Sequence, residues 1–198
     1  MLRRPAGPPH ELVPFARDPR LAGLGVRAGA VREGARLWLA WLIDDPGGRV
    51  ALGPVAPATQ PARRERLWEH TCVEAFIAPG DGTPYWELNV SPSGDWNVYR
   101  FERERSGMAP ETRIAGLAAF SATAGPGGGV AIAAELDLSP VPELADAGLA
   151  GPGSAGGGLA LGLAAVLGSV AGERSYWALR HAGEVPDFHR RESFVVRL

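Results

Sequence analysis

The sequence predicts an all-β fold, an antiparallel β-sandwich with few or no helices. Three observations lead to this prediction: roughly eight or nine short runs alternate between apolar and polar residues, turn-forming residues separate them, and helical periodicity is almost absent. Alternation indicates strands because successive side chains of a strand point to opposite faces of the sheet. A chain of 198 residues can bury a substantial core, and we expect a single domain over residues 1–198.

Two strands are expected after the proline-rich start, near 25–31 and 36–43. The second strand carries apolar residues on both faces, which predicts burial on both sides or a face partly covered by loops. Residues 44–66 are rich in Pro, Gly and Arg, so we expect a long connection without regular structure.

The most informative stretch, residues 66–101, holds three of the six tryptophans and the single cysteine. Within it, Pro92-Ser93-Gly94 suits a three-residue hairpin loop, because Pro fixes φ and Gly supplies a left-handed residue. Pairing Ser91 with Asp95 sorts the side chains by polarity. One face then carries Val90, Leu88 and Trp86 opposite Trp96, Val98 and Arg100, while the other carries Asn89 and Glu87 opposite Asn97 and Tyr99. We expect the first face to be core and the second to be polar and open.

The preceding run places its polar side chains on the same open face. One face of this run carries Val73, Ala75 and Ile77, and the other carries His70, Cys72, Glu74 and Phe76. Glu74 therefore lies on the same face of the sheet as Glu87 and Asn89. A sugar requires hydrogen-bonding groups for its hydroxyls and a flat aromatic surface for its ring, and this face offers both. The alternative is an ordinary solvated face of an antiparallel sheet.

Further strands are expected near 114–122, 130–138, 159–167 and 175–181, with a short helical turn near 143–149. A Gly-rich loop is expected near 151–158. Phe194, Val196 and Leu198 alternate and are expected to close the chain on one face of a strand.

The run LWEHTCVEAF…YWELNVSPSGDW, with the later SYWAL and PDFH, resembles bacterial DOMON-like domains, relatives of the family-nine carbohydrate-binding modules. The resemblance covers most of the chain and implies a β-sandwich whose better-known relatives bind sugars or haem. It implies ligand contacts for Glu74, Glu87 and Asn89. Trp68 and Trp96 correspond to an aromatic clamp only by neighbourhood.

The predicted function is therefore non-catalytic binding of a carbohydrate or another small polar ligand. One alternative is a haem-binding domain, with Met108, His70 or His181 as axial groups; another is a protein-interaction domain. The predicted ligand-binding residues are Trp68, His70, Glu74, Glu87, Asn89, Trp96, Tyr99 and His181.

Neither catalysis nor a metal is predicted. Alternate residues of a strand lie about 6.5 to 7 Å apart, so His70 and Glu74 cannot activate Cys72 as a nucleophile. The spacing of His181, Asp187 and His189 does not match a compact zinc site.

Composition limits the remaining classes. The formal net charge of -2 without a basic tail argues against nucleic-acid binding, and one cysteine excludes an internal disulfide framework. The start lacks the apolar core of a secretion signal, and the longest apolar run, 159–167, is too short to span a bilayer. We expect a cytoplasmic protein without a membrane partner.

Overall fold

The structure, a computed structural model, describes residues 10–55, 61–80, 82–125, 127–148 and 157–198. Within these ranges the fold is all-β and antiparallel, which confirms the predicted fold class. The described helices are one α-helix of four residues, α1 (Pro142–Ala145), and three short 3-10 turns: η1 (Pro19–Leu21), η2 (Leu67–Glu69) and η3 (Arg191–Ser193). No described helix is long and apolar enough to cross a membrane.

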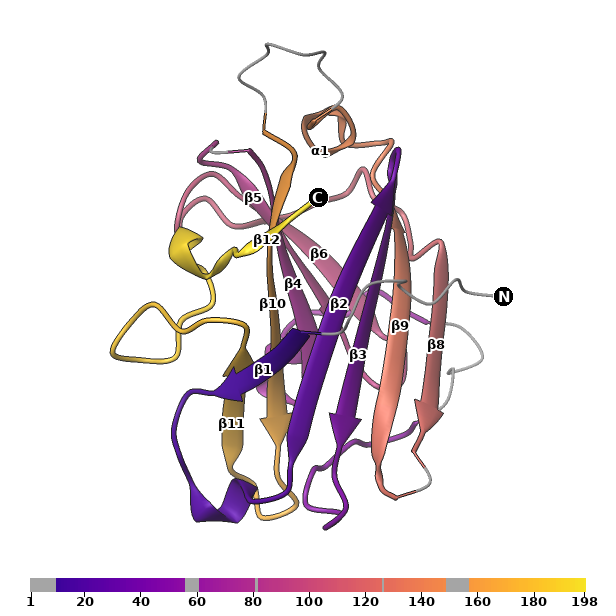
Figure 1. Cartoon of the computed structure of the whole chain (residues 1–198). Helices are drawn as coiled ribbons and strands as arrows, with labels where there is room; N and C mark the ends of the chain where they lie inside the picture. Colours follow the sequence, from indigo (N-terminus) through magenta and orange to yellow (C-terminus); the bar gives the residue numbers. More distant parts are fainter. Residues whose placement is uncertain (1–9, 56–60, 81, 126, 149–156) are drawn as a thin grey trace.

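Two layers of strands face one another (Figure 1). The first layer has the order β1-β2-β3-β9-β8 and the second β7-β6-β5-β4-β10-β11-β1, with β12 also paired to β10. The first-layer strands are β1 (His10–Pro14), β2 (Gly25–Glu33), β3 (Arg36–Asp44), β8 (Ala119–Ala124) and β9 (Gly129–Asp137). The others are β4 (Cys72–Pro79), β5 (Tyr85–Val90), β6 (Trp96–Phe101), β7 (Ala109–Pro110), β10 (Leu159–Gly168), β11 (Arg174–Ala178) and β12 (Val196–Arg197).

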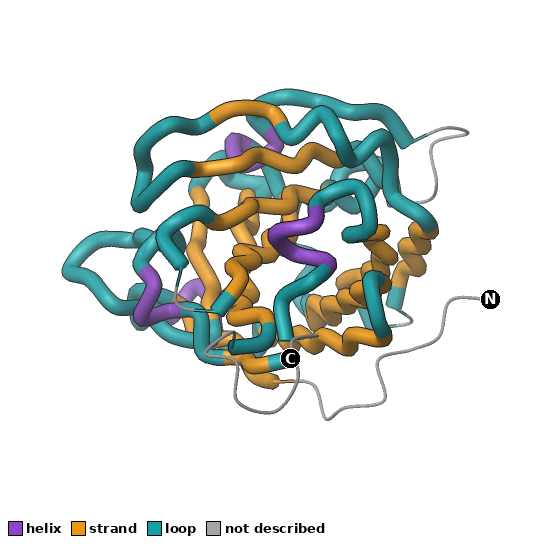
Figure 2. The backbone as a smooth tube through the Cα atoms, turned by 90° about the horizontal axis from the view of Figure 1, so that it is seen from above, coloured by secondary structure: helices purple, strands orange, loops and turns teal. Residues whose placement is uncertain are grey.

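Strand β1 joins the two layers into one curled sheet. Its first residues pair with β2, whereas Val13 and Pro14 pair with β11. The view from above shows the strands arranged around the interior, with loops at the periphery (Figure 2). Strand β1 was not predicted from the sequence, because it has only five residues, too few to show a clear alternation.

The main core lies between the layers and follows the predicted alternation. Leu37, Leu39, Trp41 and Ile43 of β3 are buried, and Trp38, Ala40 and Leu42 on its other face are half-buried. This agrees with a strand whose second face is partly covered. Trp177 of β11 is also buried there.

The hairpin β5–β6 has the predicted register. Ser91 N–H donates to Asp95 O (2.8 Å), Gly94 has a left-handed backbone (φ 93°), and Val90, Leu88 and Glu87 lie opposite Trp96, Val98 and Tyr99. In β4, Val73, Ala75 and Ile77 contribute to the main core as expected. The local pattern therefore determined both strand faces correctly.

The expectation of an open second face is wrong. Every residue of β5 is buried, because η2 and the segment 186–194 cover this face of the sheet. Phe188 and Phe194 pack there against Phe76, with ring centroids 6.2 and 5.8 Å away, and form a second, smaller core. Phe194 thus belongs to this cluster while Val196 and Leu198 pack against the main core, so the three do not share a face.

Several expected boundaries shift. The strand expected near 114–122 begins at Ala119, because Ile114 lies buried in a loop, and the helical turn ends at Ala145. The strand expected near 175–181 covers 174–178. Most of the expected Gly-rich loop (151–158) and residues 56–60 of the expected connection lie outside the described residues, as does the start of the chain, on which the secretion argument rests.

Candidate functional site

A cavity of about 320 Å³ lies between the second face of the β4–β5 sheet and the segments that cover it. Its floor comes from β4 and β5, and its walls come from η2, the loop 102–108, β10, β11 and the C-terminal segment. The lining residues are Trp68, Glu74, Glu87, Phe101, Arg105, Met108, Val166, Arg174, Tyr176, Pro186, Phe188 and His189.

Two buried carboxyl groups form the polar floor of this cavity. Glu74 is 3% exposed and Glu87 5% exposed. The β4–β5 register places Glu74 opposite Asn89 and Glu87 opposite Phe76, so the two carboxyl groups occupy diagonal positions on neighbouring strands. Side chains at such positions are close enough to interact.

Each carboxyl group uses one oxygen within the protein and leaves the other without a donor. The Cys72 thiol donates to Glu74 Oε1 (Sγ to Oε1, 3.2 Å), and Asn89 Nδ2 donates to Glu87 Oε1 (2.8 Å). No described residue donates a hydrogen bond to either Oε2, and both residues line the cavity, so a ligand can reach these oxygens. Asn89 Oδ1 is fully buried without a partner, which is unusual for a buried polar atom.

Burial raises the pKa of both carboxyl groups. Loss of hydration is the larger cause for Glu74, followed by the charge of Glu87, and together they raise its pKa to about 8. Loss of hydration raises the pKa of Glu87 to about 7, although Asn89 and Arg105 oppose the change. Near neutral pH the pair therefore retains a proton and can both donate and accept hydrogen bonds.

His189 faces this pair from the covering segment. Burial, together with the charge of Arg105, lowers the pKa of His189 to about 4, so its ring is neutral. Tyr85 OH accepts from Arg105 N–H (3.2 Å) and lies 2.8 Å from His189 Nδ1. The other ring nitrogen of His189, Nε2, lies 4.0 Å from Glu87 Oε2.

Aromatic rings form the walls. Trp68 is half-buried and packs edge-to-face on Tyr99, with ring centroids 5.6 Å apart. Tyr176 lies 6.2 Å from Phe188, also between centroids. Flat apolar walls above a polar floor suit a ligand with one apolar face and several hydroxyl groups.

An ion pair holds the covering segment in place. Arg105 Nη2 donates to Asp187 Oδ1 (2.9 Å), and the same oxygen accepts from the backbone N–H of His189 (3.1 Å). Arg105 has a left-handed backbone (φ 51°), a conformation that costs energy for a residue with a Cβ. Its guanidinium is thus directed to Asp187 and forms no ion pair with the carboxyl groups of the floor.

The structure brings five of the eight predicted residues together. Trp68, Glu74 and Glu87 line the cavity. Asn89 donates a hydrogen bond to Glu87, and the ring of Tyr99 packs against Trp68.

The other three predicted residues lie elsewhere. Trp96 belongs to the main core, where the guanidinium of Arg63 lies 4.3 Å from its ring centroid, so its assignment to an aromatic clamp is wrong. His70 is exposed beside a neighbouring polar pocket. His181 Nε2 lies 2.9 Å from the carbonyl oxygen of Val13, and its ring packs on Phe15.

The candidate axial groups for haem are not brought together. Met108 lines the cavity, whereas His70 and His181 lie outside it, so these residues do not fit an axial pair. In the described part of the chain, no three His, Cys, Asp or Glu side chains are placed to hold a metal ion. Cys72 is buried, and loss of hydration raises the pKa of its thiol, so the thiol stays protonated.

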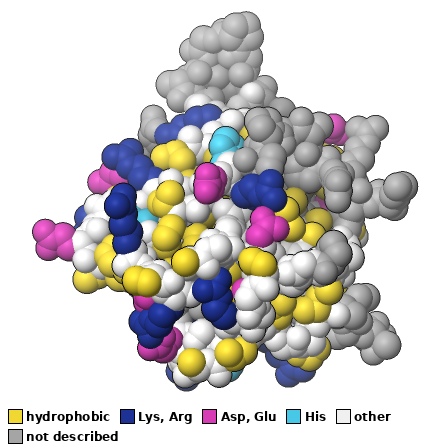
Figure 3. All heavy atoms as spheres, turned by 60° about the horizontal axis from the view of Figure 1, so that its bottom comes forward, with side chains coloured by type: hydrophobic (Ala, Val, Ile, Leu, Met, Phe, Trp, Pro, Cys, Tyr) yellow, Lys and Arg dark blue, Asp and Glu magenta, His cyan; other side chains and the backbone are white. Residues whose placement is uncertain are grey.

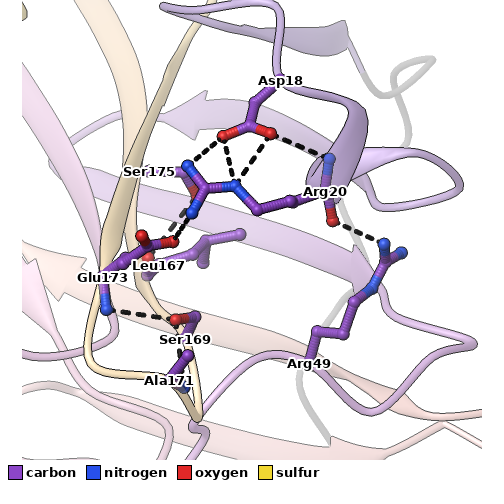
Figure 4. A network of polar contacts seen from close by, with 8 residues as sticks. All are labelled: Asp18, Arg20, Arg49, Leu167, Ser169, Ala171, Glu173 and Ser175. Carbon is purple, nitrogen blue, oxygen red and sulfur yellow. Dashed lines mark hydrogen bonds and ion pairs between the residues drawn. The ribbon is translucent and has the colours of Figure 1, made fainter.

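A second cavity, of about 340 Å³, lies near η1 and the β10–β11 turn. Several polar groups of its border pair with one another: Asp18 accepts two hydrogen bonds from Arg20 Nε, Arg20 also binds Glu173, and Arg49 donates to the carbonyl of Arg20 (Figure 4). Seen from below, acidic and basic side chains are interspersed with apolar ones (Figure 3). Because the acidic groups at its border, Asp18 and Glu173, already bind Arg20, this cavity is a weaker candidate.

Sequence reasoning named Met108 only as a candidate axial group for haem and missed the other wall residues, namely Phe101, Arg105, Val166, Arg174, Tyr176, Pro186, Phe188 and His189. Two signals were present. The SYWAL and PDFH motifs contain Tyr176, Pro186, Phe188 and His189, and only their spatial position was unknown.

No protein-family profile matches the chain, and no curated protein matches it in sequence. Two solved structures resemble it. A proposed carbohydrate-binding protein from Bacteroides uniformis is 15% identical, with a TM-score of 0.57 over 94% of this chain and 82% of that one. A family 9 carbohydrate-binding module from Caldicellulosiruptor kristjanssonii in complex with glucose is 12% identical, with a TM-score of 0.39 over 78% and 66%. The first likeness shows a shared β-sandwich fold.

Proposed function

We propose that this chain is a non-catalytic binding protein for a carbohydrate or a closely similar polyol, held in the cavity above Glu74 and Glu87. The observation that carries the proposal is the pair of buried carboxyl groups with free oxygens below an aromatic wall. Sugar hydroxyls both donate and accept, and a carboxyl pair that shares a proton offers both functions. Trp68 offers the flat surface that a pyranose ring packs against.

Two further points support a binding role. The structural neighbour from Bacteroides uniformis is itself a proposed carbohydrate-binding protein, and the family-nine resemblance implies ligand contacts for Glu74 and Glu87, which line the cavity. Among the described residues, the side-chain partner of the buried, protonated Cys72 is the carboxyl group of Glu74, and no histidine hydrogen-bonds to the thiol as a base. The same proposal includes a relation between this chain and the bacterial DOMON-like domains that its sequence resembles.

A tryptophan comparison tests the site. Thermal shift and calorimetry with a panel of mono- and disaccharides should identify a ligand of the wild-type chain. Trp68→Ala should weaken its binding at least about tenfold, a loss of roughly 1.4 kcal/mol, while the protein stays folded. Trp38→Ala is the matched control, because Trp38 is equally half-buried but lies on β3, outside the cavity.

The proposal fails if no saccharide on the panel binds the folded wild-type chain. It also fails if Trp38→Ala and Trp68→Ala weaken binding equally, because the ligand would then not occupy this cavity.

A further inference from the structure

Two other buried carboxyl groups, Asp45 and Glu111, each form an ion pair with an arginine, and Glu111 gives the clearer contrast with the cavity floor. Glu111, 4% exposed, accepts from Trp86 Nε1 (2.9 Å) and from the guanidinium of Arg113 (Nη2 to Oε2, 2.7 Å). Glu74 and Glu87 are equally buried, yet no cation hydrogen-bonds to either of them among the described residues. A buried carboxylate without a cation is unfavourable unless a proton or a ligand supplies the charge.

The charged neighbours of the pair supply no direct cationic partner, although the charge of Arg105 lowers the pKa of both carboxyl groups. His189 is uncharged and 4.0 Å from Glu87 Oε2, and the guanidinium of Arg105 binds Asp187. Arg174 lies at the rim, where its exposed charge is screened by water. The titratable and charged groups around the pair are Cys72 on β4, Tyr85 on β5, Tyr99 on β6, Arg105 in the loop 102–108, Arg174 and Tyr176 on β11, and Asp187 and His189 in the covering segment.

A cationic ligand group fits the free oxygens. Oε2 of Glu74 and Oε2 of Glu87 have no donor among the described residues, and both residues line the cavity. An ammonium group offers three donors and one positive charge. The aromatic rings of Trp68 and Tyr176 add faces that attract a cation. A calcium or magnesium ion is a poorer match, because it requires six or more oxygen ligands and two carboxyl groups supply too few. No three described His, Cys, Asp or Glu side chains are placed to hold another metal ion.

We infer that the cavity takes an amino sugar, with its ammonium group between Glu74 and Glu87 and its ring against Trp68. The inference rests on the proposed carbohydrate-binding function and specifies the ligand class. It also predicts proton release: both carboxyl groups are mostly protonated near pH 6.5, and an ammonium group stabilises their ionised form, so the pair releases protons when the amine binds.

Four probes separate the contributions of the amine and of the sugar: glucosamine, glucose, N-acetylglucosamine and cyclohexylamine. Calorimetry at pH 6.5, in two buffers of different ionisation enthalpy, measures both affinity and proton release. We expect glucosamine to bind at least tenfold more tightly than glucose or N-acetylglucosamine, with proton release. Cyclohexylamine, which keeps the ammonium group but lacks the hydroxyls, should bind more weakly than glucosamine.

Carboxyl variants test the assignment. Glu74→Gln and Glu87→Gln should each reduce the preference for glucosamine to less than threefold and reduce proton release. Glu69→Gln is the control, because Glu69 is an exposed acid near the neighbouring pocket, paired with Arg66, and its loss should leave the preference unchanged. Circular dichroism establishes that each variant is folded.

The possible failures are distinguishable. Equal binding of glucose and glucosamine overturns the amino-sugar inference and leaves the carbohydrate function standing. Cyclohexylamine binding as tightly as glucosamine, with no binding of glucose, assigns the cavity to a non-carbohydrate amine and overturns both. Absence of binding by every probe and by the saccharide panel also overturns both.

Discussion

Replacing Glu87 by glutamine should make the protein more stable at alkaline pH. The pKa of Glu87 is raised to about 7 by burial, whereas a solvated glutamate in the unfolded chain titrates near 4.5. The stability that protonated Glu87 contributes to the native state is fully present below pH 4.5. It is lost as the pH rises through 7, because the native state must then hold a buried charge. This difference in pKa corresponds to on the order of 3 kcal/mol of the free energy of unfolding.

Two other groups shape the pH profile. The pKa of Glu74 is raised to about 8, so ionisation of Glu74 also lowers the stability of the native state as the pH rises. His189, whose pKa is lowered to about 4, acts in the opposite direction: its contribution is present above pH 6.5 and is lost as the pH falls through 4. We therefore expect the wild type to be most stable at mildly acidic pH.

Urea unfolding at pH 5.5, 7 and 8.5 measures the effect of Glu87→Gln. The glutamine carbonyl can still accept from Asn89 Nδ2, so the variant should unfold at a similar urea concentration at pH 5.5. At pH 8.5 it should be the more stable protein, by up to about 3 kcal/mol.

Glu111→Gln is the matched control with the opposite sign. Hydrogen bonds from Arg113 are the main cause that lowers the pKa of Glu111 to about 2, so its contribution is present above pH 4.5 and is lost as the pH falls through 2. Glu111→Gln should therefore destabilise the protein at pH 7. If Glu87→Gln is also less stable than the wild type at pH 8.5, Glu87 is a required anion and the account of the cavity floor is incorrect.

Three further predictions concern the fold and the alternative ligand. Leu88→Ala should cost about 2 to 5 kcal/mol in urea unfolding, because Leu88 is fully buried in the main core; a loss below 1 kcal/mol would contradict the assigned face. Gly94→Ala should cost roughly 1 to 2 kcal/mol, because φ is 93° and a Cβ would lie 2.7 Å from the Phe120 ring; an unchanged midpoint would be inconsistent with this hairpin turn. Hemin titration should give no sharp Soret band, whereas a band removed by His181→Ala would restore the haem alternative.

The hairpin could be predicted from sequence because its determinants are local. Alternation assigns each side chain to a face, and Pro92-Ser93-Gly94 fixes the register, so Leu88 and Glu87 were assigned to the correct faces. The same register placed Trp96 on the apolar face. Its assignment to the ligand site came only from the family resemblance, and the structure agrees with the register instead.

The cover over the second face could not be predicted in this way. Phe188 and Phe194 contact Phe76 across more than one hundred positions of sequence, and segment 186–194 has no strand or helix periodicity to reveal which surface it binds. An exposed polar face and a covered one have the same local pattern, because alternation sorts side chains between faces but does not specify what packs on each.

The covering segment links stability to ligand binding in this fold. Packing of Phe188 and His189 over the sheet creates the cavity and also removes the water that would otherwise keep Glu87 acidic. The ion pair between Arg105 and Asp187 fastens that cover. A ligand that supplies donors or a positive charge to the two carboxyl groups compensates for the lost hydration, so it should stabilise the native state most at alkaline pH, where the empty floor is least favourable. The carboxyl pair that limits the stability of the unliganded protein is thus the feature that gives a ligand its binding energy.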